Sequence, residues 1–224
     1  LGNAEGDAIS VDAAGNVYSA GYFYNTTDFA PGVGVYNLTS NGMEDIYVCK
    51  LDPTGNFIWA KSFGSTSTEE IFAIDLDLNN NVVITGDFRN TCDFDPGSSS
   101  FILTSLGVED IYVCKLDASG NFVWATTIGS TKSEQSRSLV IDGSNGIYIT
   151  GYYTDVVDFD PGLSVFNLSA GGINNTAAFI CKIDASGGFV WAKSSGGSSS
   201  FVGGESIPLD VNGNIFVSAY SRNT

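Results

Sequence analysis

A long internal repeat constrains this chain more than any other feature of its sequence. Residues of the same type return at intervals of 65 to 68 positions along the 224-residue chain. The repeated positions are held by Gly21, Gly86 and Gly151; by Pro31, Pro96 and Pro161; by Trp59, Trp124 and Trp191; and by Asp12, Asp77, Asp142 and Asp210. A period of this length is typical of proteins in which similar units stack on their neighbours.

Each unit contains four short apolar segments, which predict four β-strands. In the second copy they occupy residues 70–77, 81–88, 110–117 and 121–129. Tight turns rich in Asp, Asn and Gly join the first segment to the second and the third to the fourth, as expected for antiparallel hairpins. A longer excursion joins the second to the third. No window carries an apolar stripe of helical period, so the chain is predicted to be all-β.

Four antiparallel strands per repeat predict a β-propeller built of four-stranded blades. The third segment is apolar on both faces, as expected for a sheet packed between two neighbours, whereas a β-sandwich does not need so regular a repeat. We predict three full blades, at residues 1–64, 65–129 and 130–197, and two strands of a fourth at 198–224. These units would form one propeller domain of a longer chain. Flanking repeats of that chain, or another copy, would complete the ring.

Several of these repeated stretches resemble a known family. The segments "GNVYSAGYF", "DFAPG" and "DIYVCKLDPTGNFIWAKSFG" are similar to the SBBP-type β-propeller repeat, which occurs in large secreted and surface-attached bacterial proteins. The resemblance covers essentially the whole chain. A looser similarity connects it to the NHL propeller repeat, which lacks the long excursion. The resemblance implies a propeller fold and a secreted or cell-surface location, but no defined activity.

The pentapeptide DFDPG, at residues 93–97 and again at 158–162, has two interpretations. Residues two apart in an extended segment point the same way, so Asp93 and Asp95 share one face and Phe94 takes the other. In the first interpretation the aspartates cap a Pro-Gly turn within a hairpin and the phenylalanine is buried. This interpretation needs no ligand.

In the second interpretation the same carboxylates bind Ca²⁺, because hard cations prefer several oxygen ligands. An acidic pair at the far end of the excursion would then complete the site. The predicted ligands are Asp93, Asp95, Glu109, Asp110, Asp158 and Asp160. Only the second copy holds all four acids, since the first copy has Ala30 and the third lacks the acidic pair. The spacing also differs from the twelve-residue calcium loop.

The cysteines and tryptophans follow the repeat, and we predict that both pack in the core. Cys49, Cys114 and Cys181 share one position of the third strand, where successive blades would hold them too far apart for disulfides. The chain has no histidine and no C-x-x-C motif, so a zinc site is not expected. The alternative for the tryptophans is a platform on which sugars stack.

Charge and residue content exclude several classes of function. The net charge is −16, with 9 Lys and Arg against 25 Asp and Glu, so nucleic acid is not an expected partner. The sequence has no run of 18 apolar residues, so no membrane-spanning helix is predicted. Without histidine there is no Ser-His-Asp or Cys-His pair. The departures from the repeat are Arg89, Lys132, Arg137 and residues 171–178 and 196–204, and we expect them to form no catalytic constellation.

We therefore expect a non-catalytic binding or scaffold module of a secreted or cell-surface bacterial protein. Its ligand would be a protein or a glycan, as in adhesion, contacted through the long excursions or one end of the ring. One alternative is a glycosidase or lyase that uses carboxylates. Another is a purely structural spacer of a surface filament.

Overall fold

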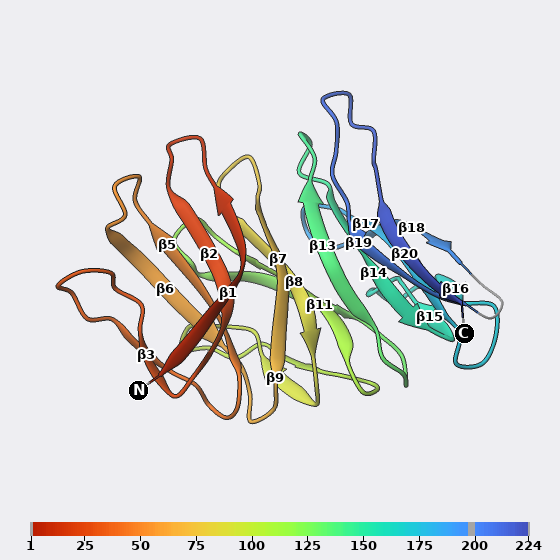
Figure 1. The fold of residues 1–224 in the computed structure, drawn as a ribbon, viewed down its shortest axis with the longest axis horizontal. Coiled ribbons are helices and arrows are strands. Elements are labelled where there is room, and N and C mark those ends of the chain that lie inside the picture. The colour runs from red at the N-terminus through yellow and green to blue at the C-terminus, as the bar shows by residue number, and fades with distance from the viewer. Residues whose placement is uncertain (1, 197–199, 224) are drawn as a thin grey trace.

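The computed structural model describes residues 2–196 and 200–223, and within these ranges it contains strands and turns but no helix. It follows that no helix there could cross a membrane. The sheets stand side by side in chain order, from the N-terminal sheet at one end to the last strands at the other (Figure 1). Part of the 196–204 departure and the predicted boundary after residue 197 lie outside the described residues.

Three antiparallel units of four strands each make up most of the structure, and in each unit the strands follow their order in the chain. The first two are separate sheets, and the third, called the third sheet below, is the larger part of a six-stranded sheet. The first sheet consists of β1 (Asn3–Val11), β2 (Val17–Tyr24), β5 (Asp45–Leu51) and β6 (Phe57–Phe63). The second consists of β7 (Glu69–Leu76), β8 (Val82–Phe88), β11 (Asp110–Leu116) and β12 (Phe122–Ile128). The third consists of β13 (Gln135–Ile141), β14 (Ile147–Thr154), β17 (Thr176–Ile183) and β18 (Phe189–Ser195). The prediction of repeated four-stranded antiparallel sheets is confirmed.

A further hairpin follows the third sheet. It pairs β19 (Ser200–Ser206) with β20 (Ser218–Asn223), and one parallel bridge between Thr176 and Phe201 joins it to β17. The second sheet meets the third through a parallel bridge of the same kind, between Glu109 and Ser133. The hairpin is therefore joined to the third sheet in the same way as the third sheet is joined to the second.

Each long excursion between the second and third strands of a sheet folds into a small hairpin of its own. The pairs are β3 (Thr26–Asp28) with β4 (Asn37–Thr39), β9 (Thr91–Asp93) with β10 (Ile102–Thr104), and β15 (Val156–Asp158) with β16 (Asn167–Ser169). The hairpin predicted around DFDPG is confirmed.

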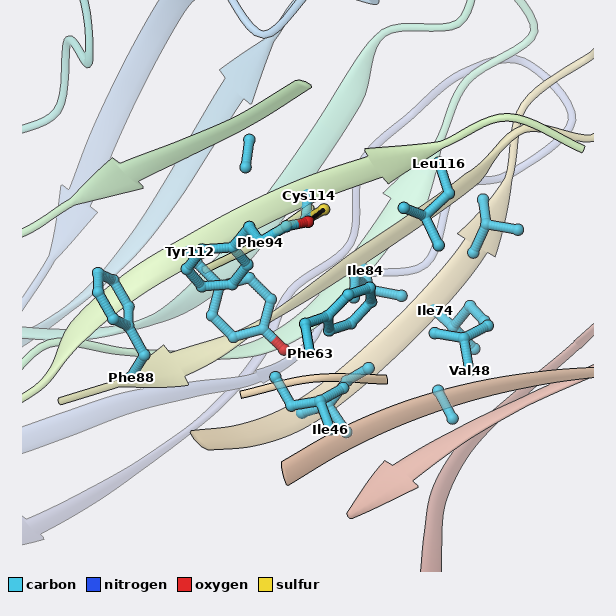
Figure 2. Close-up of a cluster of buried hydrophobic side chains, with 14 of the residues drawn as sticks. Ile46, Val48, Phe63, Ile74, Ile84, Phe88, Phe94, Tyr112, Cys114 and Leu116 are labelled. Carbon is cyan, nitrogen blue, oxygen red and sulfur yellow. Dashed lines mark hydrogen bonds between the residues drawn. The ribbon is translucent and has the colours of Figure 1, made fainter. Parts of the chain in front are cut away.

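The hydrophobic core lies between neighbouring sheets. One cluster joins Ile46 and Val48 of the first sheet to Ile84 and Tyr112 of the second (Figure 2). A second cluster joins the opposite face of the second sheet to the third. Every residue of β8 is buried, as expected for a strand covered on both faces. All four cysteines are buried and free, which confirms their predicted packing role.

The turn chemistry predicted from the Asp-Gly-Asn motifs is present in the structure. Asp52 Oδ1 accepts the backbone N–H groups of Thr54 at 2.8 Å and Asn56 at 2.9 Å. The same pattern, with acceptance from residues two and four positions later, occurs at Asp12, Asp77, Asp117, Asp142, Asp184 and Asp210. These aspartates fix the hairpins and are thereby accounted for without a ligand.

The repeated tryptophans connect neighbouring sheets. Trp59 Nε1 donates to the carbonyl oxygen of Ala118 at 3.3 Å, and Trp124 Nε1 donates to that of Ala185 at 3.2 Å. Each acceptor lies in the turn between the last two strands of the next sheet. Both indoles also pack against the core clusters. For these two residues the packing interpretation is confirmed.

Candidate functional site

The DFDPG aspartates are occupied by backbone hydrogen bonds. Asp93 Oδ1 accepts from the N–H groups of Asp95 at 3.1 Å and Phe101 at 2.8 Å, and Asp95 Oδ1 accepts from Gly97 at 2.8 Å. Phe94 between them is fully buried. In the third sheet Asp158 and Asp160 make the equivalent bonds. This geometry is that of a capped turn with a buried anchor.

The other two predicted calcium ligands have partners of their own. Asp110 is fully buried and accepts from the backbone of Leu106 at 2.9 Å. Glu109 forms an ion pair with Arg89. In the part of the chain that the structure describes, no group of three or more Asp, Glu, Cys or His side chains is placed to hold a metal ion. Calcium binding at these six residues stays a prediction.

Replacing Asp93 by alanine tests the two interpretations of the turn. We expect a loss of roughly 1.5–3 kcal/mol in the free energy of unfolding, because two N–H groups lose a charged acceptor. The loss should be the same in EDTA and in millimolar Ca²⁺, measured by thermal melts. If Ca²⁺ instead raises the melting temperature of the wild-type chain and leaves the variant unchanged, the turn is a cation site.

A β-bulge recurs in the first strand of every sheet. The pairing register shifts between Gly6 and Ala8 in β1, and at the corresponding points of β7, β13 and β19. The residues at these shifts are Asp7, Phe72, Arg137 and Glu205, which we call the bulge row. Bulges redirect side chains and are common beside active sites. The repeated backbone thus presents an acid, an aromatic ring, a base and an acid in turn.

A cluster of charged and polar side chains surrounds the third member of the bulge row. It consists of Glu70, Asp87, Arg89, Glu109, Gln135 and Arg137, and we call it the charged cluster. Glu70 and Asp87 face each other across β7 and β8, while Gln135 and Arg137 come from β13 of the neighbouring sheet. The cluster therefore exists only because the second and third sheets pack together.

Glu109 is the centre of the charged cluster. Besides the ion pair with Arg89, it accepts from Ser133 Oγ at 2.8 Å and from Gln135 Nε2 at 2.9 Å. Burial by itself would raise the pKa of Glu109, but these hydrogen bonds and the Arg89 charge outweigh it and lower the pKa. Glu109 is consequently held as a carboxylate.

Arg137 completes the charged cluster through its guanidinium group. Its Nη2 donates to Gln135 Oε1 at 2.6 Å. The guanidinium carbon lies 4.5 Å from the ring centre of Phe72 and 5.8 Å from that of Tyr152, within the range of a cation–π interaction. An aromatic member of the bulge row thus supports the basic one.

Asp87 has the most strongly perturbed environment in the charged cluster. Its side chain is buried, with 2% of the residue exposed, and Oδ1 has no hydrogen-bond partner among the described residues. Burial, followed by the charges of Glu70 and Glu109, raises the pKa of Asp87 to about 8. The carboxyl is therefore largely protonated in the folded protein at neutral pH.

The raised pKa of Asp87 predicts a pH-dependent effect of Asp87→Asn. The unfolded chain releases this proton near pH 4 and the folded chain near pH 8, so the carboxyl destabilises the fold increasingly as pH rises between these values. Relative to wild type, the variant should therefore be more stable at pH 8 than at pH 4. Between pH 4 and pH 8, the difference in unfolding free energy between the variant and wild type should change by more than about 1.4 kcal/mol, the equivalent of one pKa unit.

Urea unfolding of both proteins at the two pH values measures this difference. The Asp28→Asn variant is a contrasting control, because backbone hydrogen bonds from Tyr36 and Ala30 lower the pKa of Asp28. The destabilising effect of Asp28→Asn is lost only as pH falls below about 4 through that lowered pKa, so this variant should not gain stability relative to wild type between pH 4 and pH 8. A stability difference between Asp87→Asn and wild type that is the same at pH 4 and pH 8 would contradict the assignment.

The structure brings two of the departures from the repeat together. Arg89 and Arg137, which were expected to form no catalytic constellation, both belong to the charged cluster around Glu109. Lys132, the third such departure, does not join them and pairs with Asp155 at 3.6 Å. The sequence singled out Glu109 only as a calcium ligand, which stays a prediction, and did not predict its contacts with Arg89 and Gln135. A signal was present, since the bulge-row positions change residue type while the glycines around them repeat.

A cavity of about 190 Å³ lies beside the charged cluster, between the first and second sheets. Its lining consists of Asp7, Tyr22, Glu44, Glu70, Ile71 and Phe72. We call it the acidic cavity, because three of the six residues are carboxylates. Tyr22 and Tyr24 donate their hydroxyls to Glu5 and Glu44 at its edge.

Comparison with known proteins shows a similarity to a viral protein. No protein-family model matches the chain, so the SBBP and NHL resemblances stay predictions. The chain is 26% identical over 213 residues to an uncharacterized WD repeat-containing protein, L264, of Acanthamoeba polyphaga mimivirus. The match covers 84% of this chain but only 15% of that protein's length. Because WD repeats build propellers, the similarity together with the repeated sheets favours a β-propeller type of repeat.

Proposed function

We propose that the sheets are blades of a β-propeller and that the chain acts as a non-catalytic module that binds a protein partner. The blades would follow the repeat of about 65 residues, with three complete and two strands of a fourth. The name of the similar viral protein supports a propeller of the WD type, and such repeats present binding surfaces. A glycan partner and a secreted or cell-surface bacterial location stay predictions.

The bulge row is the observation that carries this proposal. Turns, core residues and inter-sheet tryptophans keep their identity from sheet to sheet, so they serve the fold. The bulge row keeps its backbone geometry but changes from Asp7 to Phe72 to Arg137 to Glu205. Variable side chains on a constant frame are how repeat proteins build binding surfaces.

Exposure of the first sheet supports a ring that extends beyond these sheets. Ile9 is 69% exposed, whereas Ile74 and Leu139, at the same position of the next two sheets, are each 7% exposed. The difference arises because each later sheet is covered by the one before it. We propose that a further blade, from flanking repeats or another copy, covers Ile9.

The alternative of an enzyme has one observation in its favour. The pKa of Asp87 is raised and that of Glu109 is lowered. Pairs of carboxyl groups with pKa values shifted in opposite directions also occur as catalytic acid and base. Both side chains are almost fully buried, with 2% and 7% of each residue exposed, and Glu109 is tied to Arg89. This arrangement supports a structural cluster more than a catalytic one.

Binding and catalysis are separated by two assays on the same preparation. The first probes an array of random-sequence peptides with the labelled chain, and the second incubates the chain with a panel of polysaccharides and measures new reducing ends. We expect saturable binding to a subset of peptides and no polysaccharide cleavage. Cleavage that disappears in a Glu109→Gln variant would overturn the proposal in favour of a carboxylate-dependent enzyme.

A further inference from the structure

The acidic cavity and the charged cluster occupy equivalent places in successive pairs of sheets. Moving 65 residues along the chain takes Asp7 to Phe72, Tyr22 to Asp87, Glu44 to Glu109, Glu70 to Gln135 and Phe72 to Arg137. The register shifts of β1, β7 and β13 show that Asp7, Phe72 and Arg137, the residues of the first and last of these correspondences, lie at the same bulge. The two sites can therefore be compared position by position.

Between the second and third sheets, the chain fills this place with its own guanidinium group. Arg137 lies over the ring of Phe72 at 4.5 Å and donates to Gln135, which in turn donates to Glu109. An aromatic ring and a polar neighbour, which is itself hydrogen-bonded to a carboxylate, thus hold one planar cation. The folded protein therefore shows that a guanidinium group fits at this place between two neighbouring sheets.

Between the first and second sheets, the corresponding position holds Phe72 in place of an arginine. Phe72 is in contact with Arg137 of the third sheet, and the space bounded by Asp7, Tyr22 and Glu44 remains a cavity of about 190 Å³. No lysine or arginine belongs to its lining. Position by position, the cavity has Asp7 where the neighbouring site has Phe72, Tyr22 where it has Asp87, and Glu44 where it has Glu109. Both sites therefore have aromatic and carboxylate walls, in a different order, and only the neighbouring site contains a cation.

The carboxylates in and around the acidic cavity carry like charges close together. Burial and then the charge of Glu5 raise the pKa of Asp7. Burial, followed by the charges of Glu109 and Glu44, also raises the pKa of Glu70. A bound cation would relieve this repulsion, because an opposite charge within about 4–6 Å favours ionised carboxylates.

We infer that the acidic cavity binds a guanidinium group, the side chain of an arginine on a protein partner. This inference rests on the proposed protein-binding function and names the chemistry that the partner must offer. A guanidinium is planar and weakly hydrated, so it stacks on rings and pairs with carboxylates at once. A calcium ion needs six to eight oxygen ligands, and no described group of acids is arranged for one.

The test is a titration with three blocked tripeptides that differ only at the central residue. Glycine–arginine–glycine, its lysine analogue and its citrulline analogue are titrated into the chain and followed by calorimetry and NMR. We expect the arginine peptide to bind at least about tenfold more tightly than the citrulline peptide, which has the same shape without the charge, a ratio equal to about 1.4 kcal/mol. Equal affinity for the two peptides would overturn the inference.

Two variants locate the binding site. Asp7 is exposed on its strand, so Asp7→Asn should fold normally and weaken arginine binding about three- to tenfold. Phe72→Arg places an arginine at the position equivalent to Arg137 and should fill the cavity from within, which abolishes peptide binding. Asn41→Ser, on an exposed loop residue outside the cavity lining, serves as the control and should bind as wild type does. Unchanged binding by Asp7→Asn would contradict the inference even if Phe72→Arg fails to fold.

Further arms distinguish the source of the guanidinium and a competing metal. Free arginine should bind no more tightly than the blocked peptide, and tighter binding of the free amino acid would point to a small-molecule site. Millimolar Ca²⁺ should not displace the peptide, and displacement would indicate a metal site.

If the array yields peptides whose binding needs no arginine, the inference fails and the protein-binding proposal stands. If the array yields no peptide at all, the proposed function fails.

Discussion

Replacing Phe94 by alanine is expected to lower the free energy of unfolding by about 3–5 kcal/mol, the cost of a large aromatic deletion in a packed core. Phe94 is fully buried, and its ring centre lies 4.8 Å from Tyr112 and 5.3 Å from Phe88. Figure 2 shows Phe94 beside Tyr112 and Cys114 within the core cluster between the first two sheets. The deletion would open a cavity that strands on both sides cannot collapse to fill.

The chain provides its own control for this prediction. Phe29 occupies the same position of the first sheet and packs on Phe23 and Tyr47, at 5.3 Å and 4.6 Å, but it is only partly buried because no sheet covers it. Phe29→Ala should therefore cost clearly less than Phe94→Ala. Urea unfolding of both variants measures the two losses. Losses of equal size would show that burial between sheets is not what makes the DFDPG phenylalanine important.

Replacing Gly86 by alanine is expected to cost about 3 kcal/mol, the upper end of the usual cost of overpacking, because the added Cβ meets backbone and no side chain can move aside. A Cβ at Gly86 would overlap the carbonyl oxygen of Glu70, the residue just before the bulge in β7. Gly21 and Gly151 stand in the same relation to Glu5 and Gln135. The repeated glycine is thus what allows the bulge, and with it the placement of the bulge row.

A second glycine separates this steric effect from the general cost of replacing glycine. Gly143 lies in a turn where an added Cβ meets no atom within 4 Å, so Gly143→Ala should change stability by about 0.5 kcal/mol or less. Melting temperatures of the two variants provide the comparison. Gly86→Ala should also weaken any peptide binding at the bulge row. A Gly86→Ala chain as stable as wild type would mean that β7 and β8 are not held this close.

Local features of the fold could be predicted because they depend on neighbours in sequence. Asp52 and its equivalents bond residues two and four positions later, and the DFDPG hairpin closes over eight residues between Asp93 and Phe101. Strands were recognisable from short apolar runs between such turns. Because the sequence repeats, each local prediction made for one unit also applied to the others.

The candidate site could not be predicted because it depends on contacts between sheets. Arg137 meets Phe72 and Glu109 meets Gln135 only after the second and third sheets pack together. The bulge that directs Arg137 is a one-residue shift in pairing, and no local propensity marks it. The acids of DFDPG drew attention through their spacing, although that spacing is explained by the turn.

One charge change tests directly whether the bulge row contacts the partner. Asp7→Lys places an ammonium in the acidic cavity, and Ser99→Lys places one on the exposed tip of an excursion. Calorimetry with the tightest-binding array peptide should give an affinity at least about tenfold weaker for Asp7→Lys, equal to about 1.4 kcal/mol, and unchanged for Ser99→Lys. Equal affinity for both variants and wild type would contradict the account and move the binding surface away from the bulge row.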